Sequence, residues 1–222
     1  MTGGARSRPG TLTREAVVAA AVSLADRQGL ERLSMRALAA DLGVEAMSLY
    51  NHVRNKDDLI DAMVEAVLAE VERPRPGPDW RGGLRARAVS MRAAFLAHPW
   101  APQLIVGRLN IGPNMLALYD ATIGCLVAAG VDHARADHLC NAMDSLIYGF
   151  HLLERTFPLQ PEHYADAARA FLPRIDPDHL PHMHAMTRLV AEGQHSGVHD
   201  FAFAMDLMLD TMEAATARMR AS

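Results

Sequence analysis

Apolar residues in the first 70 positions repeat at helical spacing and are separated by short polar breaks. The apolar face of the first segment consists of Val17, Ala20, Ala21 and Leu24. Thr13 precedes this segment as a potential N-cap, and Gly29 follows it as a potential helix terminator. This spacing predicts a helix over residues 14–28, preceded by a flexible arm, residues 1–10.

Three more short helices are expected before residue 73. Ser34 is placed to cap the segment MRALAADL, which ends at Gly43. The segment EAMSLYNHV then predicts a third helix, and Asn55 is placed to cap a fourth over residues 56–72. The turn between the second and third helices is therefore tight and contains glycine.

A Pro/Gly-rich stretch, RPRPGPD at residues 73–79, separates these helices from a longer helical region. We expect a head over residues 1–72, with the fourth helix as connecting rod, and a body over residues 80–222. Helical patterns in the body cover residues 80–97, 113–129, 133–157, 178–194 and 199–219, and the segments HPWAP and FPLQPEHY interrupt them.

Composition supports an all-α fold. Half of the chain is apolar, aromatic residues make up 5%, and Ala, Leu, Met and Arg are abundant. No apolar run reaches 18 residues and no leader is recognisable, so we expect a cytoplasmic protein. Cys125 and Cys140 fall in apolar helical patterns and are expected to be structural thiols rather than a disulfide.

Charge is distributed unevenly along the chain. The whole chain carries −4, whereas residues 1–60 contain eight Arg and Lys against seven Asp and Glu. An acidic total therefore does not exclude nucleic acid at the N-terminal end, although a balance of +1 alone does not indicate it.

The stretch SMRALAADLGVEAMSLYNHV, residues 34–53, has the pattern of a helix-turn-helix at about residues 35–52. Ala39 is small where the helices cross, and Gly43 is free to take a positive φ at the turn. The apolar contacts between the helices are expected from Leu38, Leu42, Val44 and Leu49. The face left polar carries Ser48, Tyr50, Asn51 and His52. On spacing alone, an ordinary pair of antiparallel helices remains equally possible.

The segment SMRALAADLGVEAMSLYNHVRNKDDLIDAM and the helix before it closely resemble the DNA-binding head of the TetR (tetracycline repressor-like) family of transcriptional regulators. The resemblance covers residues 12–70, with LGV, SLYNHV and NKDDL in unbroken register. It implies a helix-turn-helix head on a larger helical body that binds a ligand and dimerises. The body resembles the family in length and helical content only.

The same resemblance implies roles for single residues of the head. Arg36 matches a position that reaches a guanine edge, and Lys56, the only lysine of the chain, matches a phosphate contact. Ala46, Met47 and Ser48 match base contacts, and Tyr50 and His52 match contacts to backbone phosphates; Asn51 lies on the same exposed face. Because Ala46 and Met47 cannot donate hydrogen bonds, we expect an operator different from that of the tetracycline repressors.

Two body helices carry apolar stripes suited to a four-helix dimer interface, although these stripes could also be buried within one chain. One stripe consists of Leu139, Met143, Leu146, Ile147, Phe150 and Leu153. The other consists of Phe201, Met205, Met208, Leu209, Met212 and Met219. Since family members pair through their last long helices, the resemblance favours a homodimer.

Other apolar faces of the body are candidates for a ligand pocket, with ordinary core as the alternative for each residue. The candidates are Met91, Phe95, Trp100, Leu104, Met115, Tyr119, Met143, Ile147 and His151. We therefore expect a largely apolar small-molecule effector. Tetracycline is disfavoured, because Glu72 stands where the family places a drug-contacting histidine.

Neither a metal site nor an enzyme is predicted. His179, His182, His184, His195 and His199 are expected in solvated loops, and no cofactor motif is present. A helical enzyme using Asp137, His138 or Asp144 has only those residue types in its favour. The sequence predicts a repressor that binds a palindromic operator as a homodimer and is released by a small molecule; a constitutive DNA-binding regulator is the alternative.

Overall fold

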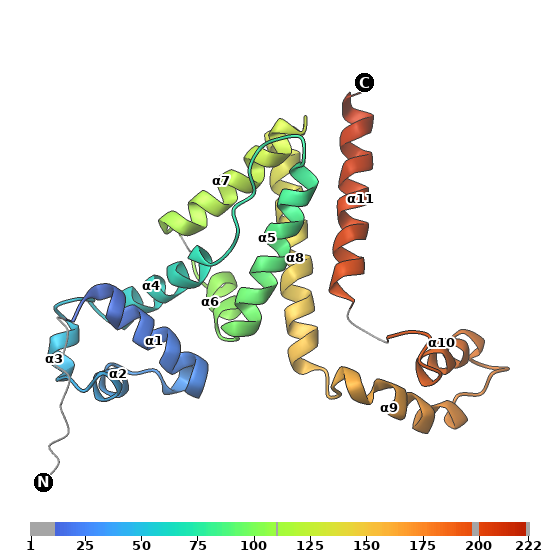
Figure 1. Ribbon diagram of the computed structural model, residues 1–222, viewed down its shortest axis with the longest axis horizontal. Helices are drawn as coiled ribbons and strands as arrows, with labels where there is room; N and C mark the ends of the chain where they lie inside the picture. The colour runs from blue at the N-terminus through green and yellow to red at the C-terminus, as the bar shows by residue number, and fades with distance from the viewer. Residues whose placement is uncertain (1–11, 110, 197–199, 221–222) are drawn as a thin grey trace, which may run out of the picture. The chain divides into compact units, whose positions relative to one another are not determined.

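A computed structural model describes residues 12–109, 111–196 and 200–220, and the arm at residues 1–10 lies outside this range. The described residues form helices and turns with no strand, which confirms the all-α prediction (Figure 1). The chain forms two compact units, Met1–Cys140 and Asn141–Ser222. None of the described helices is long and apolar enough to cross a membrane.

The first unit contains seven described α-helices and the start of an eighth. These are α1 (Arg14–Gln28), α2 (Met35–Leu42), α3 (Ala46–Leu49), α4 (Lys56–Ala69), α5 (Trp80–Ala97), α6 (Ala101–Gly107) and α7 (Pro113–Ala128), with a 3-10 turn, η1 (Leu30–Arg32), after α1. Helix α4 contacts α1 on one side and α5, α6 and α7 on the other (Figure 1). It is therefore the element that joins the first three helices to the rest of this unit.

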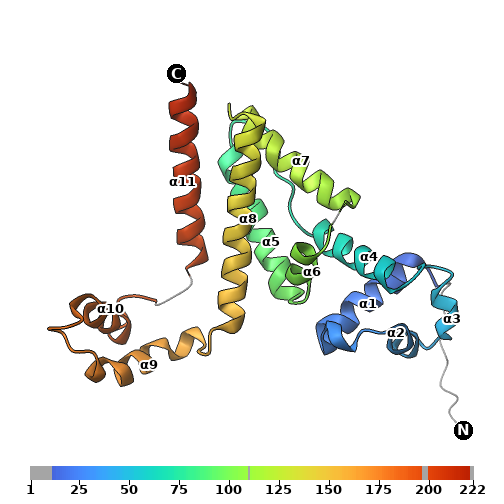
Figure 2. The ribbon, with the colours of Figure 1, turned by 180° about the vertical axis from the view of Figure 1, so that it is seen from behind.

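The second unit contains most of α8 and the helices after it. The bounds are α8 (His133–Thr156), α9 (Tyr164–Phe171), α10 (Pro181–Ala191) and α11 (Phe201–Arg220), with 3-10 turns η2 (Pro161–His163) and η3 (Leu172–Arg174). Helices α9 and α10 lie side by side, as Figure 2 shows. Phe150 of α8 meets Phe201 of α11 edge to face, with ring centroids 5.5 Å apart.

Local capping explains where the first helices begin. The hydroxyl of Thr13 accepts from the Ala16 amide at 3.2 Å, and the hydroxyl of Ser34 accepts from the Ala37 amide at 3.1 Å. The Asn55 side-chain oxygen accepts from the Asp58 amide at 2.8 Å. All three predicted N-caps are confirmed, because each cap needs only a partner three residues ahead.

Several helix bounds differ from the predicted ones. Helix α3 ends at Leu49 and α4 ends at Ala69, both earlier than expected. The predicted break HPWAP contains the start of α6, because Pro102 stands in the first turn, where its missing N–H costs no hydrogen bond. Likewise, the predicted break FPLQPEHY ends in the first residue of α9, Tyr164.

The core of the head is built from one face of each long helix. Fully buried side chains come from α1 (Val17, Ala21, Leu24), from α2 and α3 (Leu38, Ala39, Leu49) and from α4 (Leu59, Met63, Val67). Each buried aliphatic side chain contributes about 1.5–3 kcal/mol relative to leaving it in water. Of the predicted contacts between α2 and α3, Leu38 and Leu49 are buried, while Leu42 and Val44 are partly exposed.

The cysteines and histidines of the body are placed as follows. Cys125 and Cys140 are buried and form no disulfide bond, as predicted. His182 and His184 lie in α10 rather than in a loop, and the described part of the chain contains no cluster of three or more metal-ligating side chains. His179 pairs with Asp176 at 2.8 Å, and His199 lies outside the described residues.

Candidate nucleic-acid interface and the helices that support it

The turn between α2 and α3 is a Schellman motif built on Gly43. Its φ of 68° and ψ of 31° are left-handed, the conformation predicted from the glycine. The Gly43 amide donates to the Ala40 carbonyl at 3.2 Å, and the Val44 amide donates to the Ala39 carbonyl at 3.0 Å. A Cβ on Gly43 would meet no atom within 4 Å, so the backbone conformation, and not space, requires glycine here.

Helix α3 presents one buried and one exposed face. Leu49 is fully buried, whereas Met47 is 75% exposed and Tyr50 is 45% exposed. Asn51, Arg36 and Lys56 are also exposed, and Ala46, Ser48 and His52 are partly exposed. Most of the Met47 side chain and nearly half of the Tyr50 surface therefore face solvent, where a partner can reach them.

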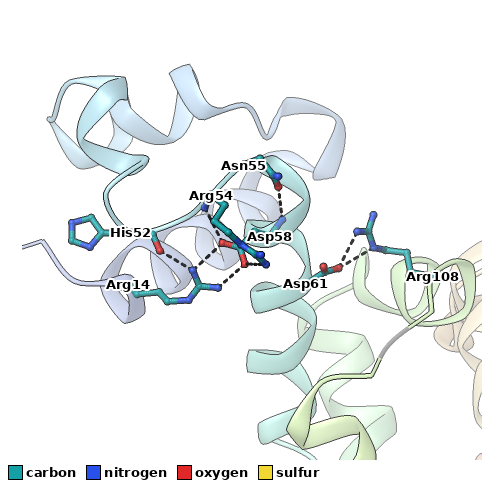
Figure 3. A network of polar contacts seen from close by, with 7 residues as sticks. All are labelled: Arg14, His52, Arg54, Asn55, Asp58, Asp61 and Arg108. Atoms are coloured by element: carbon teal, nitrogen blue, oxygen red, sulfur yellow. Dashed lines mark hydrogen bonds and ion pairs between the residues drawn. The ribbon is translucent and has the colours of Figure 1, made fainter.

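An ion-pair network anchors this surface to α1 and α4 (Figure 3). Both terminal nitrogens of Arg14 bind the Asp58 carboxylate at 3.0 Å, and one of them also donates to the His52 carbonyl at 2.7 Å. The Arg54 amide donates to the same carboxylate at 2.9 Å. The imidazole of His52 points away from the network (Figure 3), so only its backbone is committed to the fold.

Asp58 is the centre of that network and is nearly buried. Its side chain is 10% exposed and receives both Arg14 nitrogens as well as the Arg54 backbone. The hydrogen bonds from Arg14, followed by that from the Arg54 amide, hold the pKa of Asp58 far below its usual range. No sequence motif marks this contact, because Arg14 is 44 positions away in the chain.

The start of α4 combines an exposed cation with neutralised acids. Lys56 is the first residue of the helix and is exposed. The neighbouring acid Asp57 faces Arg108 at 3.4 Å, and Asp61 binds the same guanidinium at 2.9 Å. Arg108 thus offsets Asp57 and Asp61, as Arg14 offsets Asp58. A phosphate that approaches Lys56 and the helix N-terminus therefore meets little net repulsion.

Arg54 is a potential phosphate contact that the sequence reasoning missed. Its side chain is 86% exposed and lies at the turn between α3 and Lys56. The ion pair with Asp58 at 3.3 Å is at the surface, where such pairs contribute about 0–1 kcal/mol. The guanidinium can therefore exchange this partner for a phosphate at small cost.

Helix α4 also supplies the cap of α7. The Glu65 carboxylate accepts from the Asn114 amide at 2.6 Å and from the Met115 amide at 3.3 Å, at the N-terminal end of α7. The Asn114 side chain donates back to the Glu65 carbonyl at 3.0 Å. A negative charge at a helix N-terminus is favourable, so α4 and α7 are joined by a specific and directional contact.

A second junction joins α1 to the segment between α5 and α6. His98 is buried; its Nδ1 lies 2.9 Å from an Asp26 carboxylate oxygen, and its Nε2 lies 3.3 Å from Glu70. The indole nitrogen of Trp100 donates to Asp26 at 2.7 Å. Trp100 is a candidate pocket residue, and its indole N–H is therefore already hydrogen-bonded to a residue of the head.

The remaining pocket candidates are distributed over both units. In the first unit Met91, Phe95 and Met115 are buried, and Leu104 and Tyr119 are partly exposed. In the second unit Met143, Ile147 and His151 are buried. A cavity of 460 Å³ in the second unit is lined by other residues, from α9, α10 and the segments that flank them.

Two family models match the chain. The model described as "Bacterial regulatory proteins, tetR family" matches residues 17–63. The model described as "Tetracyclin repressor-like, C-terminal domain" matches residues 73–216. The second match alone covers more than half of the chain.

Curated relatives are regulators. An HTH-type transcriptional regulator of Saccharopolyspora erythraea is 44% identical over 130 residues, 58% of this chain and 55% of that protein. The repressor DrrR1 of Streptomyces coeruleorubidus is 44% identical over 108 residues, 48% of this chain and 40% of its own length. The chain thus spans about half the length of these two relatives. The class E tetracycline repressor protein of Escherichia coli is 33% identical over 165 residues, 72% of this chain and 78% of that protein.

Solved structures show the same fold over nearly the whole chain. Apo ActR of Streptomyces coelicolor matches with a TM-score of 0.78 and 26% identity, covering 96% of this chain and 99% of that chain. ActR in complex with actinorhodin matches with a TM-score of 0.73 and 27% identity, covering 94% of this chain and 98% of that chain.

Proposed function

The chain belongs to the TetR family of bacterial regulatory proteins, and from this premise we propose that it is a transcriptional repressor that binds a palindromic operator as a homodimer and is released by a small molecule. The observation that carries the proposal is the helix-turn-helix itself. The turn at Gly43 is left-handed and sets α3 at the surface. Leu49 is buried, whereas Met47 and Tyr50 are exposed, so α3 has one face that packs on the protein and one that can enter a groove of DNA.

The proposed contacts follow the exposure of the head. Arg36 recognises a guanine edge, and Ala46, Met47 and Ser48 approach bases or thymine methyls. Contacts to the phosphate backbone come from Tyr50, His52 and Lys56, and Asn51 lies on the same exposed face. The exposure of the Arg54 guanidinium supports adding it to this set.

The experiment that tests this proposal is selection of DNA sites from a random pool by the purified protein. A two-fold symmetric consensus, with one guanine per half-site assigned to Arg36, is the expected result. Recovery of unrelated sequences, with no enrichment over the starting pool, would contradict sequence-specific DNA binding.

Helix α11 supports the homodimer, although on a different face from the predicted one. The predicted stripe residues Phe201, Met205, Leu209 and Met212 are buried within the chain, and nothing is described of the Met219 side chain. Phe203 is 67% exposed and Leu207 is 57% exposed, and both lie on the opposite face. A helix that is apolar on two opposite faces is suited to burial on both, and a second copy would cover the exposed one.

The proposal of a small-molecule effector rests on the buried apolar residues of the body. ActR binds actinorhodin in one solved structure, and the pocket candidates of this chain are mostly buried apolar side chains. We therefore expect a largely apolar small molecule. The transmitter is α4, because Arg108 after α6 and the N-terminus of α7 are both bound to its carboxylates.

Effector control is tested by screening small molecules for release of the selected operator. A compound that releases it at saturable concentration supports ligand control. If no apolar or aromatic compound releases it, the constitutive DNA-binding regulator becomes the better description.

A further inference from the structure

The two helices that follow α8 flank an apolar cavity that is open to solvent and that the repressor proposal does not use. One face of α9 lines it through Tyr164, Ala167, Ala168 and Phe171. One face of α10 lines it through Met183, Met186, Thr187 and Val190. Both sets follow the spacing i, i+3, i+4, i+7, so the two apolar stripes face each other.

The two stripes do not close on one another, and the space between them is open to solvent. Here a volume of 460 Å³ remains, which is within the usual range of small-molecule pockets, about 300–1,000 Å³. Arg169 of α9 donates to the Ala191 carbonyl at the end of α10 at 2.6 Å. This bond ties the two helices together at one end and sets their separation there.

The walls of the cavity favour a flat aromatic occupant. Three aromatic rings, Phe157, Tyr164 and Phe171, and two thioethers, Met183 and Met186, lie among its lining residues. Ring edges and sulfur atoms both make favourable contacts with aromatic faces. Phe171, Met183 and Met186 are 55%, 56% and 44% exposed, so an occupant would remove a substantial apolar surface from water.

Tyr164 supplies a polar group at this site. Its side chain is only 8% exposed and is fixed by an edge-to-face contact with Phe157 at 5.5 Å. Among the residues that the structure describes, none forms a hydrogen bond with its hydroxyl. Burial, with Glu154 and Glu162 nearby, raises the pKa of Tyr164, so the hydroxyl remains a donor. Thr187 and His195 add two further polar groups to the lining.

We propose that the cavity between α9 and α10 binds a flat aromatic molecule that carries a hydroxyl or carbonyl oxygen, with that oxygen hydrogen-bonded to Tyr164. This site shares no lining residue with the candidates for effector binding in α5 to α8. Ligand binding at this site can be measured on the protein without DNA, so its test is independent of the DNA-binding proposal.

The test is a titration of the full chain with 2-naphthol, followed by its fluorescence, with naphthalene as the comparison compound that lacks the oxygen. We expect one saturable 2-naphthol site per chain. Ala167→Phe fills the cavity and should abolish this site. Ala170→Phe is the matched control, because Ala170 is exposed on the same helix and does not line the cavity.

Tyr164→Phe keeps the ring and removes only the hydroxyl, so it tests the hydrogen bond without filling space. This substitution should weaken the binding of 2-naphthol about two- to tenfold and leave the binding of naphthalene unchanged. Equal weakening of both compounds, or of neither, would overturn the assignment of the oxygen to Tyr164.

Absence of saturable binding, or binding that Ala167→Phe leaves intact, would overturn the site itself. Sedimentation of the same variants distinguishes the other possible occupant. If Ala167→Phe converts a dimer into monomers and 2-naphthol does not bind the wild type, the cavity belongs to a contact between two copies of the chain and the proposal is wrong.

Discussion

Exposure separates the side chains of α3 into those that hold the fold and those that are free to contact DNA. Leu49 is fully buried, while Met47, two residues earlier, is 75% exposed. An apolar side chain exposed to that extent on a short helix gains nothing from the solvent. Contact with a thymine methyl would bury it, which is the role proposed here.

Arg36 is the residue whose replacement should change sequence preference most. Arg36→Ala should weaken specific binding by about 1–3 kcal/mol and relax the preference at one guanine per half-site, because the bidentate guanidinium contact is lost. Arg36→Lys is the matched control: it keeps the charge and the salt dependence but not the planar fork. Affinities for operators altered at each position measure both effects. A preference unchanged at every position would show that Arg36 does not contact a base.

Single residues also show how far sequence reasoning extends. Thr13, Ser34, Asn55 and Gly43 were predictable, because their partners lie within five residues and the capping geometry follows from local chemistry. The contacts of Arg14 with Asp58 and of Asp26 with His98 join residues 44 and 72 positions apart. No periodicity or motif marks such pairs, so only the fold reveals them.

At the scale of elements, α4 is held from both sides by charged side chains. Asp58 ties its first turn to α1, Asp61 ties it to Arg108, and Glu65 caps α7. The helix therefore has defined contacts with the elements that carry DNA contacts and with those of the body. Such contacts fix the position of α4 relative to both groups of elements.

Replacement of Asp58 tests the anchor of the head. Asp58→Asn should lower the free energy of unfolding by about 1.5–3 kcal/mol at neutral pH, because the charged hydrogen bonds from Arg14 are lost. Since the folded-state pKa of Asp58 is depressed, its stabilisation is present above the unfolded value, near 4, and is lost as the pH falls below it. Urea unfolding of both proteins at several pH values measures this.

In the wild type, part of the loss of stability below pH ~4 should therefore come from Asp58. The Asp58→Asn variant should lack that part, and the two stabilities should converge in acid. Parallel curves for the two proteins down to strongly acidic pH would show that the carboxylate is not the anchor.

The exposed face of α11 gives a prediction about assembly. Leu207→Glu places a charge where a second copy would cover Phe203 and Leu207, so it should convert the dimer into monomers and weaken operator binding. Ala202→Glu is the control, because Ala202 is exposed on the same helix but lies at least 100° around the helix axis from both residues. Sedimentation velocity measures the result. A Leu207→Glu protein that remains dimeric would exclude this face as the interface.

Proline limited the prediction of elements more than any other residue. HPWAP and FPLQPEHY do separate α5 from α6 and α8 from α9, but α6 already carries Pro102 in its first turn and α9 begins at the last residue of the second segment, Tyr164. Proline stops a helix only in its interior, and a pattern of a few residues does not show on which side of a boundary it stands.

For the whole molecule, the proposed switch requires that a ligand in the body favour a dimer whose heads cannot both dock. A 100-fold difference in affinity between the two states corresponds to about 2.7 kcal/mol of coupling. By reciprocity, the operator must weaken ligand binding by the same factor. The contact between Glu65 and the start of α7 is the place where such coupling can be tested.

A disulfide between positions 65 and 112 should block the switch. A Cβ on Gly112 would lie 2.7 Å from Cγ of Glu65, so Glu65→Cys with Gly112→Cys places the two sulfur atoms within bonding reach. The oxidised protein should bind the operator and no longer be released by a compound that releases the wild type. Reduction with dithiothreitol is the control and should restore release. Normal release from the oxidised protein would mean that this junction does not transmit.

The most direct test of the account is the spacing of the two half-sites, because a dimer that docks two recognition helices in successive major grooves needs them on one face of the DNA, about 10–10.5 base pairs apart or at multiples of this. Fluorescence anisotropy compares the selected operator with one that has about five base pairs, half a helical turn, inserted at its centre. Docking of both heads on one face of the DNA predicts that the insertion lowers the affinity to that of a single half-site. Equal affinity for the two duplexes would contradict it.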